Sequence, residues 1–132
     1  MITETPPQPK NRHHSMPEGK IQAECYAWFW NTFPKYRKCY FAIPNENSRA
    51  DSSAISGAIR KSMGVTKGVA DTFMAVQKGG YGGMFVEFKT QVGTQSPDQK
   101  QWQIIIENQG YVYRVIRSLE EFKELINWYL SL

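Results

Sequence analysis

Residues 68–90 decide the fold of this chain, and they read Gly68-Val-Ala-Asp-Thr-Phe-Met-Ala-Val-Gln77, Lys78-Gly-Gly-Tyr-Gly-Gly83 and Met84-Phe-Val-Glu-Phe-Lys-Thr90. Aromatic and apolar β-formers on both sides of a glycine cluster are typical of two strands joined by a hairpin. A turn centred near Gly80 sets Asp71 roughly across from Lys89 and one step diagonal from Glu87. The hairpin is therefore expected to bring two carboxylates and a lysine together.

The chemistry of these three side chains allows two interpretations. Side chains two residues apart on a strand share a face, so Glu87 and Lys89 project together. Two carboxylates and a lysine at one spot are what a magnesium-dependent phosphodiesterase needs. The plainer interpretation is a solvated Glu-x-Lys pair with a weak ion pair, beside an Asp that serves its turn.

Outside the hairpin, hydrophobic periodicity and capping signals predict the remaining elements. They are a helix over 17–32, a strand over 39–43, a helix capped by Asp51, a helix over 97–108, a strand over 111–116 and a helix after Ser118. Ser96 with Gln99, and Ser118 with Glu121, have the spacing of capping boxes. The order α-β-α-β-β-α-β-α predicts an α/β fold, a central mixed sheet of about four strands with helices on both faces.

The composition indicates one globular domain. With 132 residues, 41% of them hydrophobic, the chain is long enough for one core, which we place at 17–132. The proline-rich residues 1–16 are expected to form a mobile arm. No apolar run approaches the roughly 20 residues of a membrane span, and the N-terminus lacks the apolar segment of a signal peptide.

The cysteines, histidines and net charge restrict the chemistry further. Cys25 and Cys39 lack metal-ligand spacing, which favours free thiols in a reducing, cytoplasmic setting. The only histidines, His13 and His14, fall in the arm, so metal chemistry rests on oxygen ligands, which favours magnesium or manganese over zinc. The net charge of +4 permits a polyanionic partner without requiring one.

Six short motifs in order resemble the VRR-NUC branch of the PD-(D/E)XK nucleases, in its small stand-alone phage and bacterial form. The motifs are Glu18-x-x-x-Gln22, Ile43-Pro-Asn-Glu46 with Arg49, Gly68-Val-Ala-Asp71, Phe85-Val-Glu-Phe-Lys89, Ser96-Pro-x-Gln99-x-x-Trp102 and Gly110-Tyr-x-Tyr113-x-Val115. The resemblance covers roughly residues 18–127 and implies a restriction-endonuclease-like core. Ala70 departs from the family, which usually has proline there; proline contributes no chemical group at that position.

The resemblance implies a role for each site residue. Asp71 and Glu87 would bind Mg²⁺, or Mn²⁺ in its place, with the backbone carbonyl of Phe88. Lys89 would orient the attacking water or stabilise the charge that develops on the phosphate. Glu18 is the expected metal-supporting acid of the first helix, with Glu24 left as the other choice, and Gln99 serves the catalytic site, the helix cap or both.

The resemblance also implies partners. Asn45 and Arg49 would lie beside the substrate cleft, while Lys61 and Lys67 would follow the DNA backbone. Small family members resemble dimeric Holliday-junction resolvases, which predicts a homodimer. Independently of the resemblance, Trp30 falls off the apolar stripe of the first helix, so an exposed Trp30 would mark a dimer contact or a base-stacking surface.

The leading hypothesis from these observations is a Mg²⁺-dependent DNA endonuclease that selects branched or junction DNA, active in the cytoplasm, including that of a bacterium infected by a phage encoding it. Two alternatives stay open. One is a catalytically silent nucleic-acid-binding module on the same fold. The other is an unrelated α/β interaction protein in which Glu87 and Lys89 are a surface pair.

Overall fold

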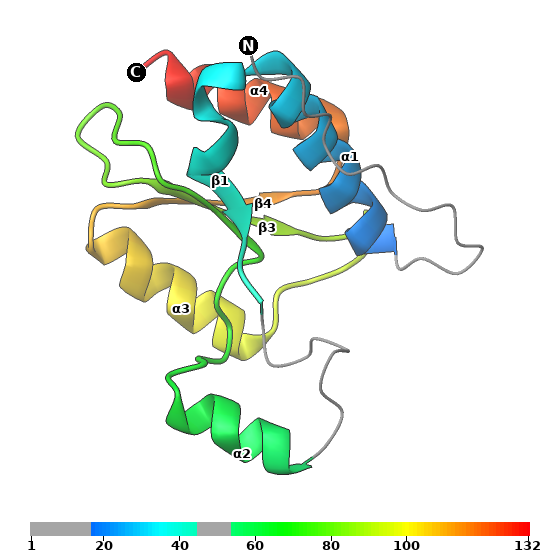
Figure 1. Cartoon of the computed structure of the whole chain (residues 1–132), viewed down its shortest axis with the longest axis vertical. Helices are drawn as coiled ribbons and strands as arrows, with labels where there is room; N and C mark the ends of the chain where they lie inside the picture. Colours follow the sequence, from blue (N-terminus) through cyan, green and yellow to red (C-terminus); the bar gives the residue numbers. More distant parts are fainter. Residues whose placement is uncertain (1–16, 45–53) are drawn as a thin grey trace.

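The computed structural model describes residues 17–44 and 54–132 (Figure 1). The predicted arm over 1–16 and the loop that contains Asn45, Arg49 and Asp51 lie outside the described residues. The described elements are α1 (Pro17–Thr32), the 3₁₀ helix η1 (Pro34–Cys39), β1 (Tyr40–Ala42), α2 (Ala54–Ser62), β2 (Thr72–Met74), β3 (Met84–Phe88), α3 (Pro97–Asn108), β4 (Val112–Ile116) and α4 (Leu119–Leu130).

The predicted order of helices and strands is confirmed, with one added element. Proline at position 34 ends α1 and begins η1, because its fixed φ suits the first turn of a helix and it has no N–H to donate. η1 then delivers the chain directly into β1, which is shorter than predicted.

The four strands form one mixed sheet in the order β1-β2-β3-β4. The first three pair antiparallel, whereas β3 and β4 run parallel. A parallel pair needs a crossover connection, and α3 provides it. The predicted α/β class and mixed sheet are therefore confirmed.

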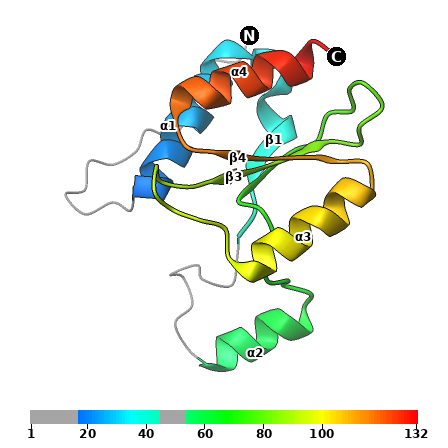
Figure 2. The ribbon, with the colours of Figure 1, turned by 180° about the vertical axis from the view of Figure 1, so that it is seen from behind.

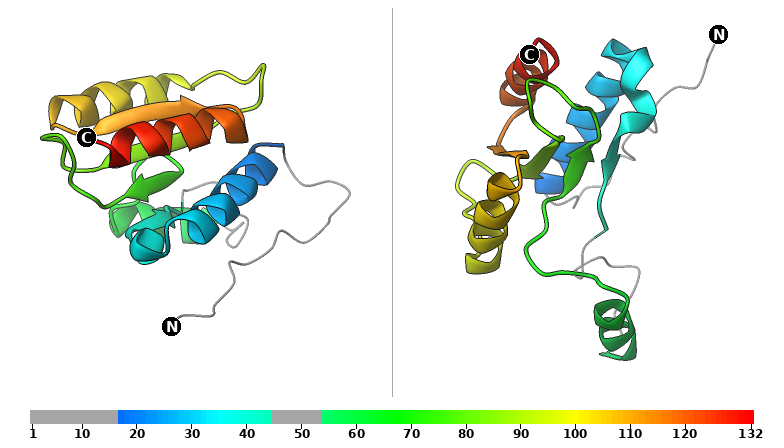
Figure 3. Two further views of the ribbon diagram at one scale, coloured as in Figure 1. Left: turned by 90° about the horizontal axis from the view of Figure 1, so that it is seen from above. Right: turned by 90° about the vertical axis from the view of Figure 1, so that its left-hand side faces the viewer.

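Helices cover both faces of this sheet (Figures 1 and 2). α1 and α4 lie side by side over one face, and α3 lies over the other (Figure 3). α2 stands beyond α3, away from the sheet (Figure 1). The layers separate a mainly apolar face, under α1 and α4, from the face that carries the polar side chains discussed below.

The main core fills the space between the sheet and the α1–α4 layer. Its centre is an aromatic cluster in which the ring of Phe122 contacts Trp28, Tyr40 and Phe88. The other buried members come from both helices and from β2, β3 and β4: Cys25, Phe29, Met74, Met84, Val86, Val112, Ile116, Leu125, Ile126 and Tyr129. Both cysteines are free, as predicted, and burial followed by the Glu24 charge raises the pKa of Cys25 to about 12.

Trp30 does not form the exposed surface that the helical periodicity suggests. Only 9% of its surface is accessible, because η1 folds back along α1 and places the Arg37 guanidinium 5.0 Å from the Trp30 ring. The Arg37 side chain also donates a hydrogen bond to the Trp30 carbonyl. Trp30 is therefore a structural residue that fixes η1 and offers no exposed ring to DNA or to a second copy.

The hairpin register differs from the predicted one by two residues. Thr72 pairs with Val86 and Met74 with Met84, so Asp71 precedes β2 at the position opposite Glu87, and not opposite Lys89. The turn closes at the Lys78–Tyr81 bridge, one residue off the register of the strands. Three residues lie between Met74 and Lys78, but only two lie between Tyr81 and Met84. A shift of two residues keeps every side chain on its face, which is why the carboxylates still converge.

Caps fix the starts of α3 and α4. The Ser96 hydroxyl accepts the Gln99 N–H at 3.1 Å and the Gln99 side chain accepts the Ser96 N–H at 2.8 Å, a complete capping box as predicted. The predicted second box is only half formed. Ser118 accepts the Glu121 N–H, but the Glu121 carboxylate accepts from the Arg117 N–H, one residue before the cap.

Loss of the α3 cap is expected to lower stability moderately. Ser96→Ala removes the acceptor for the Gln99 N–H and should reduce the free energy of unfolding by about 1 kcal/mol in urea denaturation. Ser131→Ala is the matched control, because the Ser131 hydroxyl bonds only its own exposed helix end, at the Trp128 carbonyl, and its loss should cost less than about 0.5 kcal/mol. Equal losses in the two variants would contradict a specific role for the cap.

Candidate active site

Polar side chains gather where β3 ends, beside the start of β2 and close to the beginning of α1 (Figure 1). Asp71 immediately precedes β2, and its carbonyl accepts the Ile43 N–H at 2.7 Å, which extends the pairing of β1 with β2 by one step. Glu87 and Lys89 follow on β3 and directly after it. Side-chain alternation puts all three on the α3 side of the sheet.

The approach to Asp71 is set by close contact between Gly68 and α3. Gly68 has a φ of +81°, and a Cβ built there would lie 2.4 Å from the Asp98 carbonyl oxygen, in the first turn of α3. Only glycine allows both this backbone conformation and this approach. The 68–71 segment is therefore pressed against the start of α3, which fixes where Asp71 enters the sheet.

The Asp71 carboxylate is held by the backbone of β3. Its Oδ2 accepts the Phe88 N–H at 2.7 Å. Burial raises the pKa of Asp71, the Phe88 N–H and then the Lys89 charge lower it in part, and Glu18 raises it. One oxygen of the Asp71 carboxylate is thus fixed by the backbone, and the charges of Lys89 and Glu18 act on this carboxylate from nearby.

Glu87 is fully buried, with 0% of its surface accessible. Its Oε1 accepts a hydrogen bond of 2.5 Å from the Tyr113 hydroxyl on β4. Its Oε2 is also buried, and it has no hydrogen-bond partner among the residues that the structure describes. Burial raises the pKa of Glu87, whereas Tyr113, Lys89 and Gln95 lower it and Asp71 raises it. An unsatisfied buried carboxylate oxygen is costly, so it marks a place for a cation or donor from outside the chain.

Lys89 supplies the positive charge of the site. It is half-buried, and it lowers the pKa of both Asp71 and Glu87. Its backbone N–H donates to the Ile116 carbonyl at 3.0 Å, toward β4. In an extended chain the N–H and C=O of one residue point the same way, so the Phe88 carbonyl, like the Phe88 N–H, faces Asp71.

These groups fit a hard divalent cation with few protein ligands. Within residues 17–44 and 54–132, no three His, Cys, Asp or Glu side chains gather into a group that could hold a metal. The available donors are two carboxylates and one backbone carbonyl, all oxygen. Mg²⁺ prefers such donors and keeps several waters, so the pair Asp71 and Glu87 suits it, whereas a closed zinc site would need four ligands.

The other predicted acids and amides lie at different distances from this centre. Glu18 lies against the loop after β3, since a Cβ on Gly93 would be 3.5 Å from its Oε1, and its charge raises the pKa of Asp71. Glu24 is exposed and acts on the Cys25 thiol. The Gln99 side-chain oxygen is used in the capping box of α3. The structure therefore brings Glu18 toward Asp71, leaves Glu24 away and places Gln99 at the helix cap.

Two of the predicted DNA contacts are described, Lys61 and Lys67. Both are exposed, Lys61 in the last turn of α2 and Lys67 in the segment before Asp71. Beside them a groove of about 320 Å³ separates the end of β1 from the α2–β2 connection, lined by Ile43, Pro44, Met63, Gly64, Val65, Thr66 and Val69. Asn45 and Arg49 lie outside the described residues.

The sequence did not identify Gln95 and Arg117. Gln95 is in the loop between β3 and α3, where it lowers the pKa of Glu87 and of Tyr113, and its Nε2 donates to Gln103 Oε1 at 2.9 Å. Arg117 donates to the carbonyls of Thr90 and Gly93 at 2.6 and 2.7 Å. A polar loop gives no periodic signal for either contact.

Tyr113 was part of a recognised motif but had no predicted role. Burial, and then the Glu87 carboxylate, raise the pKa of Tyr113 well above its ordinary value. The hydroxyl therefore stays protonated and donates a hydrogen bond to Glu87 Oε1. The alternation Tyr111-x-Tyr113 indicated a strand, but not which neighbour the hydroxyl meets. That information depends on the register of β4 against β3.

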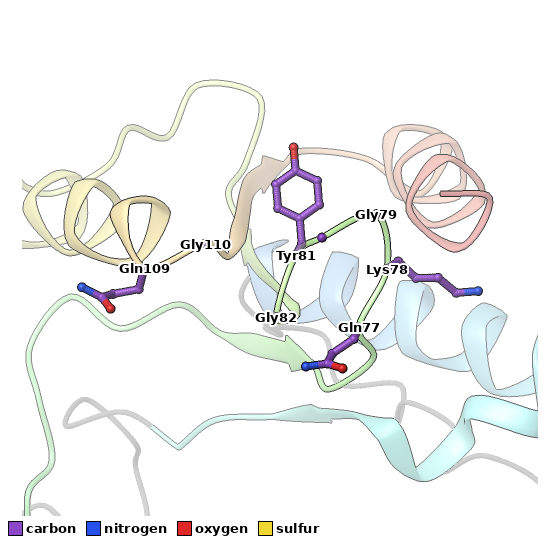
Figure 4. Close-up of a pocket in the computed structure, with 8 residues that line it drawn as sticks. Gln77, Lys78, Gly79, Tyr81, Gly82, Gln109 and Gly110 are labelled. Atoms are coloured by element: carbon purple, nitrogen blue, oxygen red, sulfur yellow. The ribbon is translucent and has the colours of Figure 1, made fainter.

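A second depression, of about 470 Å³, lies at the other end of the sheet (Figure 4). The β2–β3 turn and the α3–β4 turn line it, with Gln77, Lys78, Tyr81, Gln109 and four glycines. In Figure 4 the Lys78 and Gln109 side chains point away from each other. The polar side chains that line this depression do not converge on one point.

The fold is an α/β domain with a mixed four-stranded sheet, and an acidic pair and a lysine lie at the open end of its β2–β3 hairpin. A solved structure described as a VRR_NUC domain protein superposes on this chain with a TM-score of 0.75. It covers 90% of this chain and 92% of its own, at 21% sequence identity. This likeness confirms the fold predicted from the motifs.

The other comparisons add no relatives. No protein-family profile matches the chain, and no curated protein matches its sequence. Among the described helices, none has the length and apolar character needed to cross a membrane.

Proposed function

We propose that this protein belongs to the VRR-NUC family and is a nuclease that hydrolyses phosphodiester bonds in DNA, with Mg²⁺ as cofactor and Mn²⁺ able to replace it. The likeness in fold supports the family and the class of reaction. The observation that carries the proposal is the buried Oε2 of Glu87, which has no hydrogen-bond partner among the described residues and lies in one electrostatic cluster with Asp71 and Lys89. A merely structural ion pair would leave no oxygen unsatisfied.

In this mechanism Asp71, Glu87 and the Phe88 carbonyl would hold the cation, and Glu18 would support it from α1. When bound, Mg²⁺ supplies a Lewis acid for the phosphate and lowers the pKa of water at the site. The Phe88 N–H fixes Asp71 Oδ2, and the Tyr113 hydroxyl fixes Glu87 Oε1. Lys89 orients the attacking water or stabilises the negative charge that grows on the phosphate. Lysine suits this role as a compact charge.

The proposed substrate is branched or junction DNA, bound by a homodimer. Lys61 and Lys67 are exposed beside the approach to Asp71, where they would contact phosphates, as would Asn45 and Arg49. We place this activity in the cytoplasm, including that of a phage-infected bacterium.

The alternative function is a silent nucleic-acid-binding module on the same fold. It predicts DNA binding without cleavage, whereas an unrelated interaction protein predicts neither binding nor a metal effect on stability. These outcomes are separable in one set of assays.

The direct test is cleavage of labelled four-way-junction, flap and linear DNAs with Mg²⁺, Mn²⁺ or EDTA. Wild type should cut in the metal-containing reactions. Lys89→Ala should cut at least about 100-fold more slowly, because it loses one positioned charge that stabilises the transition state. Lys89→Ala keeps the backbone bond to Ile116, so its fold should persist.

Lys78→Ala is the matched control for this test. This variant also loses one lysine charge, but in the β2–β3 turn, at the other end of β3 from Lys89. It should cut DNA like wild type. If Lys78→Ala and Lys89→Ala lose the same activity, net charge and not the site explains the loss. If wild type binds these DNAs but never cuts them, the silent module is correct.

A further inference from the structure

Of the two oxygens of the Glu87 carboxylate, Oε1 accepts a hydrogen bond from a residue on a different strand, whereas Oε2 has no partner among the described residues. Tyr113 lies on β4, which reaches β3 only through the α3 crossover. Its hydroxyl donates to Oε1 at 2.5 Å, a length typical of a charge-assisted O–H···O⁻ bond. The other oxygen of the same carboxylate is buried without a partner among the described residues.

Tyr113 is itself held in place by packing. Its ring exposes 1% of its surface and contacts Trp102 of α3 in a T-shaped arrangement, at 5.9 Å between ring centroids. A hydroxyl on a ring that cannot turn away is a fixed donor. It therefore defines which Glu87 oxygen is occupied and, as a consequence, which one is left for another ligand.

Gln95, in the loop between β3 and α3, is a third polar residue beside Glu87 and Tyr113. Its side chain lies close enough to Glu87 and Tyr113 to lower the pKa of both, and its Nε2 donates a hydrogen bond to Gln103 Oε1 at 2.9 Å. The loop that carries Gln95 is in turn tied down by Arg117, which donates to the carbonyls of Thr90 and Gly93. The amide is thus pre-organised by contacts outside the site.

We propose that Tyr113 and Gln95 are positioning residues that lock the Glu87 carboxylate, with Oε1 occupied and Oε2 presented to a divalent cation. The inference rests on the proposed function, since it assigns this chain's own residues to the orientation of one ligand. Hydrogen bonds that orient a ligating carboxylate typically change metal affinity 10–100-fold when they are removed.

The test measures cation binding without DNA. Mn²⁺ and Mg²⁺ are titrated calorimetrically into wild type, Tyr113→Phe and Tyr111→Phe, and the melting temperature of each is followed against metal concentration. Tyr113→Phe should bind Mn²⁺ about 10–100-fold more weakly. Tyr111→Phe should bind Mn²⁺ like wild type. It also loses one tyrosine hydroxyl, but from a ring two residues earlier in the chain that packs on Phe73 and Phe85.

Cleavage kinetics separate positioning from a general loss of structure. In Tyr113→Phe the metal concentration for half-maximal cutting should rise by the same factor as the dissociation constant, while the rate at saturating Mn²⁺ stays within about threefold of wild type. Gln95→Ala, a loop substitution that leaves the core intact, should shift the same two quantities in the same direction. It keeps the proposal testable should Tyr113→Phe fold poorly.

The outcomes distinguish this inference from the function on which it rests. If wild type binds Mn²⁺ and cuts DNA, and both Tyr113→Phe and Gln95→Ala have unchanged metal affinity, the positioning role is wrong while the nuclease stands. If wild type itself neither binds Mn²⁺ nor cuts, the proposed function fails, and the positioning role fails with it.

Discussion

Replacement of Glu87 by glutamine is expected to abolish cleavage and, at the same time, to stabilise the metal-free protein at pH 8. Cleavage should fall at least about 1,000-fold, because a metal ligand contributes several kcal/mol to the transition state. The gain in stability follows from burial, which raises the pKa of Glu87 in the folded state above its unfolded value.

The sign of the pH effect is set by that raised pKa. A carboxyl with a raised folded-state pKa stabilises the fold below its unfolded pKa, and this contribution is lost as the pH rises through the folded pKa. Above the folded-state pKa of Glu87, wild type therefore carries a buried charge that Glu87→Gln lacks, whereas below the unfolded-state pKa both side chains are neutral. Asp71, whose pKa burial also raises, adds a dependence of the same sign.

The measurement is thermal unfolding in EDTA at several pH values. Glu87→Gln should melt a few degrees above wild type at pH 8, since 1 kcal/mol corresponds to about 4 °C for a domain of this size, and the gap should close toward pH 4. Glu124→Gln, at an exposed position of α4, should match wild type throughout. A variant that melts below wild type at pH 8, or that still cuts with Mg²⁺, would refute this account of Glu87.

Gly68→Ala is expected to be the most destabilising single-methyl change on the site side of the sheet. The added Cβ would lie 2.4 Å from the Asp98 carbonyl oxygen and 2.9 Å from the Gln99 nitrogen, both backbone atoms that cannot turn away. The segment before Asp71 must then separate from α3. We expect a loss of about 3 kcal/mol or more in urea denaturation, from overpacking added to backbone strain.

Gly80→Ala separates the two causes of that loss. Gly80 has nearly the same backbone angle, a φ of +86°, but nothing lies within 4 Å of a Cβ built there. It should lose only about 1–2 kcal/mol, the cost of a left-handed conformation for alanine. If the two variants lose the same stability, the close approach to α3 contributes nothing, and Gly68 is required only for its conformation.

Much of the fold was predictable because local signals act over a few residues. Ser96-Pro97 with Gln99 is a complete start signal, and α3 begins at Pro97 with both bonds of the box. The hairpin and the convergence of Asp71 with Glu87 also followed from alternation. The exact register did not, because it depends on how the 75–83 segment absorbs an extra residue, and sequence alternation is blind to shifts of two.

The parts that sequence reasoning missed depend on contacts between distant segments. Trp30 is covered because η1 folds back on α1, and no local pattern encodes that return. Tyr113 and Gln95 reach Glu87 only after β4 and the loop before α3 are in place. Local periodicity specifies which face of an element is apolar, but not which partner a polar side chain meets across the sheet.

The α3 crossover also has a consequence for the order in which the molecule assembles. The β2–β3 hairpin closes a short loop, whereas β4 joins β3 only after the longer excursion through α3, and contacts of large sequence separation form later. Until β4 docks, water can solvate the Glu87 carboxylate. We therefore expect the cost of burying this charge to fall on a step after hairpin formation, so that alkaline pH mainly speeds unfolding and leaves the rate of hairpin formation unchanged.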